Sequence, residues 1–284
     1  MGWYLAASTM GYALSLLMGG ALLARFGWRV SFVAASLGPI IGLSIAAGVL
    51  RTTPNVIAYR EPESGGLRAL SALLRNKVAM LAIWGYAFHA WELLGLWAWL
   101  PAYLTAAAGR SHDAAVAAAM GSVLAAVSFA TNAVGSVAAG RFSDRIGRAQ
   151  VMLALTLVSI ACSLAFGWLI GMPLWALTMV AIVYNLTALA DSSVYSTALT
   201  ELVPPQHLGV AYSLRAAIGF GLGGISPVVF GLVLDAFTSQ SQGRGVLSWG
   251  MAWAALGLGA VPGLIAVLRL RSISRFPSPQ RAHA

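Results

Sequence analysis

The stretch Val30-Ser-Phe-Val-Ala-Ala-Ser-Leu-Gly-Pro-Ile-Ile-Gly-Leu-Ser-Ile-Ala-Ala-Gly-Val-Leu50 contains no acidic or basic side chain. A helix of about 20 apolar residues spans the hydrocarbon core of a bilayer, so this stretch predicts a transmembrane helix. A transmembrane β-strand needs only about 9–11 residues and alternates in polarity, which an unbroken apolar run does not do. The stretch therefore favours a membrane protein built from α-helices.

The composition of the whole chain extends this conclusion. Of its 284 residues, 59% are hydrophobic and 9% are charged, and the mean hydropathy is +0.81. A soluble domain is about 45–50% apolar and about 25% charged. Turns and charges divide the chain into eight expected spans, at residues 3–23, 30–50, 78–104, 114–139, 151–170, 174–199, 208–234 and 246–268. We therefore predict an all-α polytopic membrane protein with about eight transmembrane helices, whose main partner is the lipid bilayer.

The basic residues indicate how the spans are oriented. The net charge is +9, but the basic residues separate the apolar runs and form no continuous face, so no nucleic-acid partner is expected. Loops on the cytoplasmic side of membrane proteins are enriched in Lys and Arg. Four basic residues fall on one side of the expected topology: Arg25, Arg29, Arg110 and Arg244. Twelve fall on the other: Arg51, Arg60, Arg68, Arg75, Lys77, Arg141, Arg145, Arg148, Arg269, Arg271, Arg275 and Arg281.

This bias predicts a multi-pass protein of a bacterial-type inner membrane, with both termini in the cytoplasm. A reporter fused within residues 51–77, or after Ala284, should be active as a cytoplasmic reporter. A reporter fused near Arg110 or Arg244 should be active as a periplasmic one. The reverse pattern of activities would contradict the proposed order of the spans.

A short basic loop between the fourth and fifth expected spans carries a specific motif. The sequence Gly140-Arg-Phe-Ser-Asp-Arg-Ile-Gly-Arg148 resembles the Gly-x-x-x-Asp-Arg-x-Gly-Arg loop of the major facilitator superfamily. The glycines permit a tight cytoplasmic hairpin, and the aspartate can cap a neighbouring helix N-terminus. The resemblance implies a gating loop that helps to hold the cytoplasmic side closed. Its candidate residues are Gly140, Asp144, Arg145, Gly147 and Arg148, with Glu201 at the end of the sixth span.

Two contacts of this loop are expected. Glu201 is a carboxylate on the same side of the membrane, so we expect Arg145 or Arg148 to lie within salt-bridge distance of it. We expect Asp144 to face the start of the first span.

Three other segments resemble the same family. Phe26-Gly-Trp-Arg-Val-Ser-Phe32 resembles the turn that opens the sixth of its twelve helices. Leu202-Val-Pro-Pro-Gln-His-Leu-Gly209 resembles the segment between the tenth and eleventh. Phe88-His-Ala-Trp-Glu-Leu93 resembles a variant in bacterial members that are often grouped with nitrate/nitrite or cyanate-type carriers. The resemblance implies a secondary transporter of a small solute, with an anion as one option.

Placed by these segments, the eight spans correspond to helices five to twelve of a partial major facilitator fold. We expect the last two helices of the N-terminal half at 1–50 and a cytoplasmic linker with a short interfacial helix at 51–77. A complete six-helix C-terminal half is expected at 78–268 and a disordered cytoplasmic tail at 269–284. Two functions remain open: a proton-coupled symporter present as an incomplete chain, or a non-transporting subunit, sensor or relic fragment whose partner supplies the missing helices.

Enzyme functions are not supported by any motif in the sequence. The chain contains no His-Glu-x-x-His metalloprotease motif and no Gly-x-Ser-x-Gly nucleophile motif. It also lacks a P-loop, which excludes an ATP-driven mechanism within this chain. We expect no catalytic residue, no metal site and no cofactor.

Ionisable residues inside the spans are the candidate transport residues, because each costs about 2.5–3.5 kcal/mol near the bilayer centre. His89 and Glu92 lie three residues apart and so share one face of the third span. In the family this helix lines the substrate cavity. The pair is either a structural His–Glu hydrogen bond or a site for a proton or the substrate. In the second case Glu92 carries the coupling proton and His89 orients it or the substrate.

Three further residues complete the candidate pathway for substrate and proton. Asn185 and Asp191 lie in the sixth span, which resembles the cavity-lining tenth helix of the family. Asp191 is either a tie between helices or a pathway residue. Arg215 either snorkels to the interface or pairs with Asp191, or else it binds an anion.

Overall fold

A computed structural model describes residues 2–53, 66–239 and 245–273, without the side chains of residues 2–6 and 24. Throughout these residues the ordered elements are helices, and no strand occurs among them. Two 3-10 turns, η1 (Gly167–Leu169) and η2 (Pro205–His207), supplement nine α-helices in the described part of the chain. The α-helices are α1 (Gly2–Thr52), α2 (Gly66–Arg75), α3 (Lys77–Ala108), α4 (Ala114–Ala130), α5 (Asn132–Ile146), α6 (Arg148–Phe166), α7 (Leu174–Leu202), α8 (Leu208–Thr238) and α9 (Val246–Ile273).

Six described segments are long and apolar enough to cross a membrane. They are Arg25–Thr52, Ala114–Ile146, Arg148–Leu169, Leu174–Leu202, Pro205–Thr238 and Val246–Ile273. The first expected span appears as the shorter apolar helix Ala7–Leu23. The third corresponds to α3, which has 32 residues and is roughly 48 Å long, but contains His89, Glu92 and several tryptophans that lower its hydropathy. The expectation of an all-α polytopic membrane protein is confirmed.

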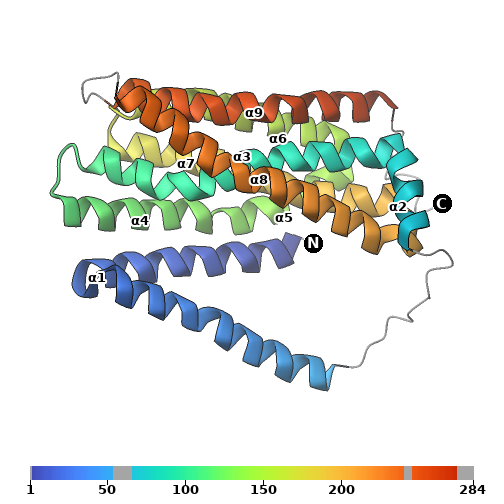
Figure 1. Cartoon of the computed structure of the whole chain (residues 1–284), viewed down its shortest axis with the longest axis horizontal. Coiled ribbons are helices and arrows are strands. Elements are labelled where there is room, and N and C mark those ends of the chain that lie inside the picture. The colour runs from blue at the N-terminus through green and yellow to red at the C-terminus, as the bar shows by residue number, and fades with distance from the viewer. Residues whose placement is uncertain (1, 54–65, 240–244, 274–284) are drawn as a thin grey trace.

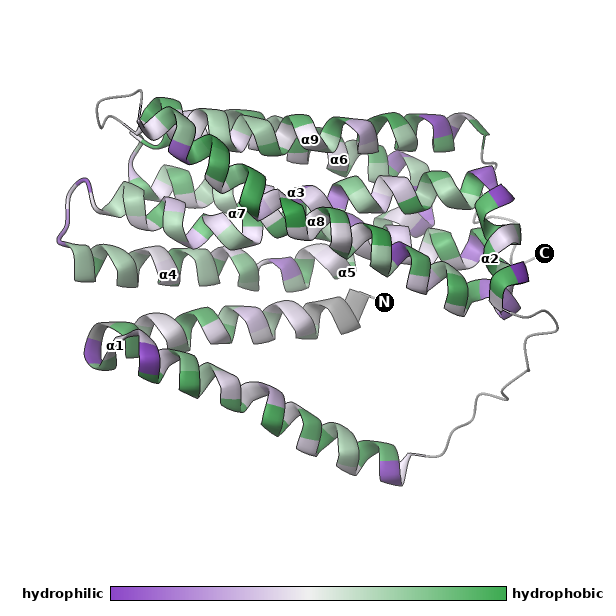
Figure 2. Cartoon of the chain, in the orientation of Figure 1, coloured by the Kyte–Doolittle hydropathy of each residue, from purple (hydrophilic) through white to green (hydrophobic). Residues whose placement is uncertain are grey.

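The first two expected spans form a helical hairpin that bends at Gly27. The φ angle of Gly27 is 76°, a left-handed conformation that glycine adopts without steric cost. The first arm packs on α4 and α5, whereas the second diverges from the bundle (Figure 1). Apolar residues dominate the second arm and hydrophilic ones lie near its ends, while Leu50 is 77% exposed (Figure 2). Such a surface suits contact with hydrocarbon.

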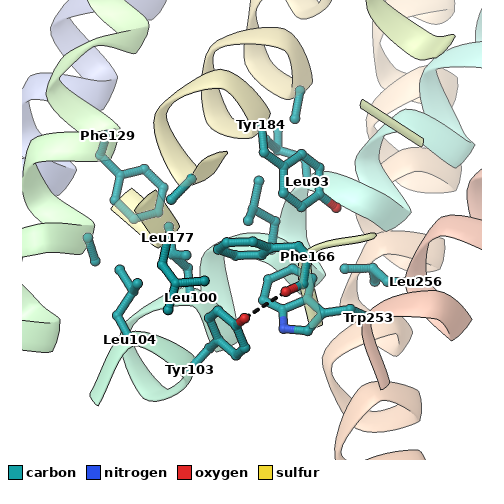
Figure 3. Packing of buried hydrophobic residues seen from close by; sticks show 14 of the residues in the cluster. Leu93, Leu100, Tyr103, Leu104, Phe129, Phe166, Leu177, Tyr184, Trp253 and Leu256 are labelled. Atoms are coloured by element: carbon teal, nitrogen blue, oxygen red, sulfur yellow. Dashed lines mark hydrogen bonds between the residues drawn. The ribbon is translucent and has the colours of Figure 1, made fainter. Parts of the chain in front are cut away.

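Helix α3 lies at the centre of the remaining bundle and packs against α4, α7, α8 and α9. Part of the core is aromatic: the rings of Tyr103, Phe166 and Trp253 pack against one another (Figure 3). The Tyr103 hydroxyl donates a hydrogen bond of 2.6 Å to the backbone carbonyl oxygen of Phe166. This bond satisfies a buried polar group and ties α3 to the end of α6.

Helices α3 and α8 approach closely through small residues. A Cβ atom at Gly219 would lie 2.7 Å from the Tyr86 ring, and one at Gly223 would lie 2.7 Å from the Ala90 carbonyl oxygen. The spacing Gly219-x-x-x-Gly223 therefore serves a contact within the chain, as small residues do between transmembrane helices. This contact fixes α8 next to the part of α3 that carries Tyr86 and His89.

Two adjacent glycines of α8 provide a matched test of this packing. Gly223→Ala should destabilise the fold by about 1–3 kcal/mol, because the obstacle is the rigid backbone at Ala90. Gly224→Ala should stabilise it by about 0.5–1 kcal/mol, since a Cβ there meets nothing within 4 Å and alanine is the better helix former. Unfolding in mixed detergent micelles measures both values. Equal effects of the two substitutions would contradict the close contact of α3 with α8.

Several boundaries differ from those expected. The basic loop is no open hairpin, because α5 remains helical to Ile146 and only Gly147, with a φ of 101°, breaks the helix. Helix α9 continues to Ile273, so the first part of the expected tail is helical, and residues 274–284 lie outside the described residues. The expected interfacial helix of the linker is present as α2, which buries Ala69 and Leu73 near the ends of α3 and α8.

Candidate functional site

A buried polar cluster joins α3 to α7. The Nδ1 atom of His89 lies 2.9 Å from Oδ1 of Asp191, and its Nε2 atom lies 2.6 Å from Oγ of Ser192. His89 is 7% exposed and Asp191 is 2% exposed. Both ring nitrogens therefore have partners, and these partners fix the orientation of the imidazole.

Glu92 lies in the same cluster with a partner of its own. It is 3% exposed, and its Oε1 atom accepts a hydrogen bond of 3.1 Å from the Tyr184 hydroxyl. His89 and Glu92 share a helix face, as expected, but each binds a residue of α7. His89 thus pairs with Asp191, and not with Glu92 as the structural alternative expected.

The three ionisable side chains line one small cavity between α3, α6, α7 and α9. Its volume is about 10 Å³, at the lower limit of the roughly 10–15 Å³ that a single water molecule needs. All four helices belong to residues 78–268, so this face of α3 is turned into the six-helix bundle and away from α1. The expectation that this face lines a cavity between two halves stays a prediction. The space is comparable in size to one water molecule and is too small for an organic solute.

Asn185 lies outside this group. Its side chain is completely buried, and neither its Oδ1 nor its Nδ2 atom has a hydrogen-bond partner within the described residues. It does not line the cavity that His89, Glu92 and Asp191 share. The structure therefore leaves the proposed pathway role of Asn185 without a contact to support it.

Arg215 does not pair with Asp191, which is occupied by His89. Its Nη1 atom instead donates a hydrogen bond of 2.8 Å to Oγ of Ser196. Its guanidinium carbon lies 4.2 Å from the ring centroid of Tyr86 and 4.8 Å from that of Tyr212. Cation–π contacts of this kind compensate part of the cost of a buried charge.

The ion pairs at the junction of α5 and α6 include the one expected. The Nη2 atom of Arg148 lies 2.9 Å from Oε1 of Glu201, which confirms the predicted salt bridge. Arg148 also binds Asp144, so Asp144 is no helix cap and pairs within its own loop. The side chains at the start of the first span lie outside the described residues. The pair at Glu201 is partly solvent-exposed and should contribute at most about 1 kcal/mol to stability.

Two other residues of the expected gating loop have no such contact. Arg145 is exposed on the same side of α5 as Arg141, and both line a shallow pocket. A Cβ atom at Gly140 would meet nothing within 4 Å, so no close packing requires a glycine there. The expected role of the loop thus depends on Arg148, Glu201 and the turn at Gly147.

Four residues of the site escaped sequence analysis: Tyr86, Tyr184, Ser192 and Ser196. One signal was present in the sequence. Ser192 and Ser196 lie one helical turn apart on α7, and repeated hydroxyl groups at that spacing in an apolar helix indicate a polar face. The two tyrosines gave no comparable signal, because tyrosines in membrane helices are commonly packing or interface residues.

Comparison with known proteins places this geometry in a family. The Major Facilitator Superfamily profile matches residues 1–214 and 111–283, in two overlapping matches. An "MFS-type efflux pump" of Mycolicibacterium smegmatis is 27% identical over 252 residues, which cover 82% of this chain and 55% of that protein. A "Hexuronate transporter" of Bacillus subtilis is 23% identical over 268 residues, which cover 87% of this chain and 60% of that protein.

The chain thus spans between half and two thirds of the length of these relatives. The family matches together extend over almost all of its residues. They agree with the helical fold and with the motif between α5 and α6. The chain belongs to the major facilitator superfamily.

Proposed function

We propose that this protein acts as a proton-coupled secondary transporter of a small solute. The observation that carries the proposal is the group of Glu92, His89 and Asp191 around a water-sized cavity within the bundle. Ionisable residues at such depth are rare in membrane helices, and they mark proton relays and ion pathways.

The contacts of the cluster suit the uptake and release of a proton. Glu92 is protonated at low cost in a buried site, since a neutral acid is cheaper there than a carboxylate. His89 accepts or donates at Nε2 toward Ser192, while Asp191 orients its ring through Nδ1. A water molecule in the shared cavity would link the two groups. Changes in water access on either side of the membrane would then set the direction of proton movement.

The cytoplasmic ion pairs are the proposed gate of this transporter. Arg148 joins the start of α6 to Glu201 near the end of α7, so it ties two helices together at this end of the bundle. A pair worth at most about 1 kcal/mol biases a conformational equilibrium without locking it. The charge bias of the loops supports a cytoplasmic location for this gate and for both termini.

The names of the relatives favour transport over a non-transporting role. One is called an efflux pump and the other a hexuronate transporter, so both names describe proteins that carry solutes. No feature of the described site favours a sensor or a partner-dependent subunit over a transporter.

The proposal is tested in membrane vesicles from cells that express the protein from its own chromosomal locus. D-glucuronate and ethidium serve as probes for a sugar acid and a lipophilic cation. An imposed pH gradient should drive one of them against its concentration gradient, and adding that probe should dissipate the pH gradient. Vesicles from a deletion strain provide the control. If each probe moves equally fast in vesicles from the expressing strain and from the deletion strain, the result would contradict a transport function.

A further inference from the structure

Arg215 carries a charge within a membrane-spanning helix, and no carboxylate balances it among the described residues. Its Nη1 atom binds Ser196, but its buried Nε atom has no hydrogen-bond partner in the described part of the chain. A buried donor without an acceptor loses its hydration and gains nothing in return. The described residues therefore leave the Nε–H group of Arg215 without an acceptor, and a bound ligand would supply one.

The surroundings of the guanidinium restrict what this acceptor can be. The Tyr86 and Tyr212 rings lie close to it, and Ser196 occupies Nη1. The Tyr212 hydroxyl is itself held by the Ser196 carbonyl oxygen at 2.8 Å, so this ring has a fixed position. Within the described residues no hydrogen bond is made by the edge formed by Nε and Nη2, and its two parallel N–H groups match the two oxygens of a carboxylate.

We infer that Arg215, Tyr86, Tyr212 and Ser196 form a binding subsite for the carboxylate group of a small organic anion. This inference rests on the proposed transport function and names the class of solute. A single guanidinium carries one positive charge, which balances one carboxylate and leaves a phosphate dianion only half neutralised. The rings of the two tyrosines hold the guanidinium through cation–π contacts and so fix the direction of its remaining edge.

The subsite is connected to the proton-binding cluster through α7. Ser196 Oγ donates a hydrogen bond of 2.8 Å to the Ser192 carbonyl oxygen, and the Ser192 hydroxyl contacts His89 Nε2 at 2.6 Å. The Tyr86 ring centroid lies 5.6 Å from that of His89 and also contacts Arg215. A carboxylate at Arg215 would thus bind next to residues that contact His89, namely Tyr86 and the Ser192–Ser196 turn of α7.

The test measures binding by the purified full chain in detergent, without any proton gradient. The probes are lactate, D-gluconate and D-glucuronate, compared with lactamide, D-glucose and inorganic phosphate. A ligand that binds only the folded protein raises its melting temperature in a saturable way. At least one carboxylate should do so, whereas its neutral counterpart and phosphate should not. Equal stabilisation by phosphate, or none by any carboxylate, would overturn the inference.

Variants locate the effect at Arg215. Arg215→Gln removes the charge, and Arg215→Lys keeps the charge but loses the two-pronged edge, so both should weaken carboxylate binding by about 10- to 100-fold. Arg68→Gln removes an exposed arginine of α2 and should bind as the parent does. If Arg215→Lys binds carboxylates as the parent does, the inference that the two N–H groups of Arg215 hold the carboxylate is overturned. This outcome can be read even if Arg215→Gln fails to fold.

This experiment remains informative if the proposed transport function is wrong. Carboxylate binding that is lost in both Arg215 variants, in a protein that moves no solute with protons, would support the subsite and reject proton coupling. Transport without any carboxylate binding would support the transporter and reject the subsite.

Discussion

Glu92→Gln is expected to abolish proton-driven accumulation of the solute while largely preserving exchange of solute across the membrane. The amide has the shape of the acid, and its side-chain oxygen can still accept the hydrogen bond from Tyr184. It cannot take up or release a proton at neutral pH. Exchange requires only that the loaded carrier reorients, whereas accumulation requires that the proton leaves on the other side. Accumulation under a pH gradient and counterflow of labelled solute measure the two activities separately.

Two further variants control for altered packing. Glu92→Asp keeps a titratable group and should retain part of the accumulation. Ser128→Ala removes a buried hydroxyl of α4 that donates a hydrogen bond to the Leu124 carbonyl oxygen of its own helix, and it should leave accumulation unchanged. If Glu92→Gln accumulates solute as well as the parent protein, Glu92 has only a structural role.

The helices were predictable from the sequence to within a few residues at most ends. Uncharged apolar runs specify transmembrane helices because the cost of charges in hydrocarbon is large and independent of the partner. Helix α2 was equally clear, since Leu67, Leu70, Leu73 and Leu74 recur at helical spacing. The position of the turn at Gly147 was harder to predict, because nothing in residues 140–146 prevents α5 from continuing as a helix.

The partners within the candidate site were only partly predictable. The pairing of Arg148 with Glu201 followed from the scarcity of carboxylates on that side of the membrane. The pairing of His89 with Asp191 did not follow, because it depends on how α3 and α7 are rotated against each other. Spacing along one helix shows which residues share a face, but not which helix that face meets. For the same reason the sequence left Arg215 and Asp191 as candidates for an ion pair.

The second large effect is expected at the contact between His89 and Asp191. His89→Leu or Asp191→Val alone should destabilise the fold by about 3 kcal/mol, because each leaves its buried partner without the contact at 2.9 Å. The double variant should lose clearly less than the sum of the two, since it leaves neither group unpaired. Reversible unfolding in mixed detergent micelles provides all four free energies of this double-mutant cycle.

Transport by the double variant then separates stability from mechanism. If the pair carries or orients the coupling proton, the double variant should fold nearly as well as the parent protein yet fail to accumulate solute. The matched control is Thr178→Val, at a buried hydroxyl of α7 that donates a hydrogen bond to the Leu174 carbonyl oxygen of its own helix and should change neither property. Single variants as stable as the parent, with no coupling energy in the cycle, would contradict the contact between α3 and α7 on which the site depends. A stable double variant that accumulates solute normally would leave Glu92 as the proton carrier and remove His89 and Asp191 from the mechanism.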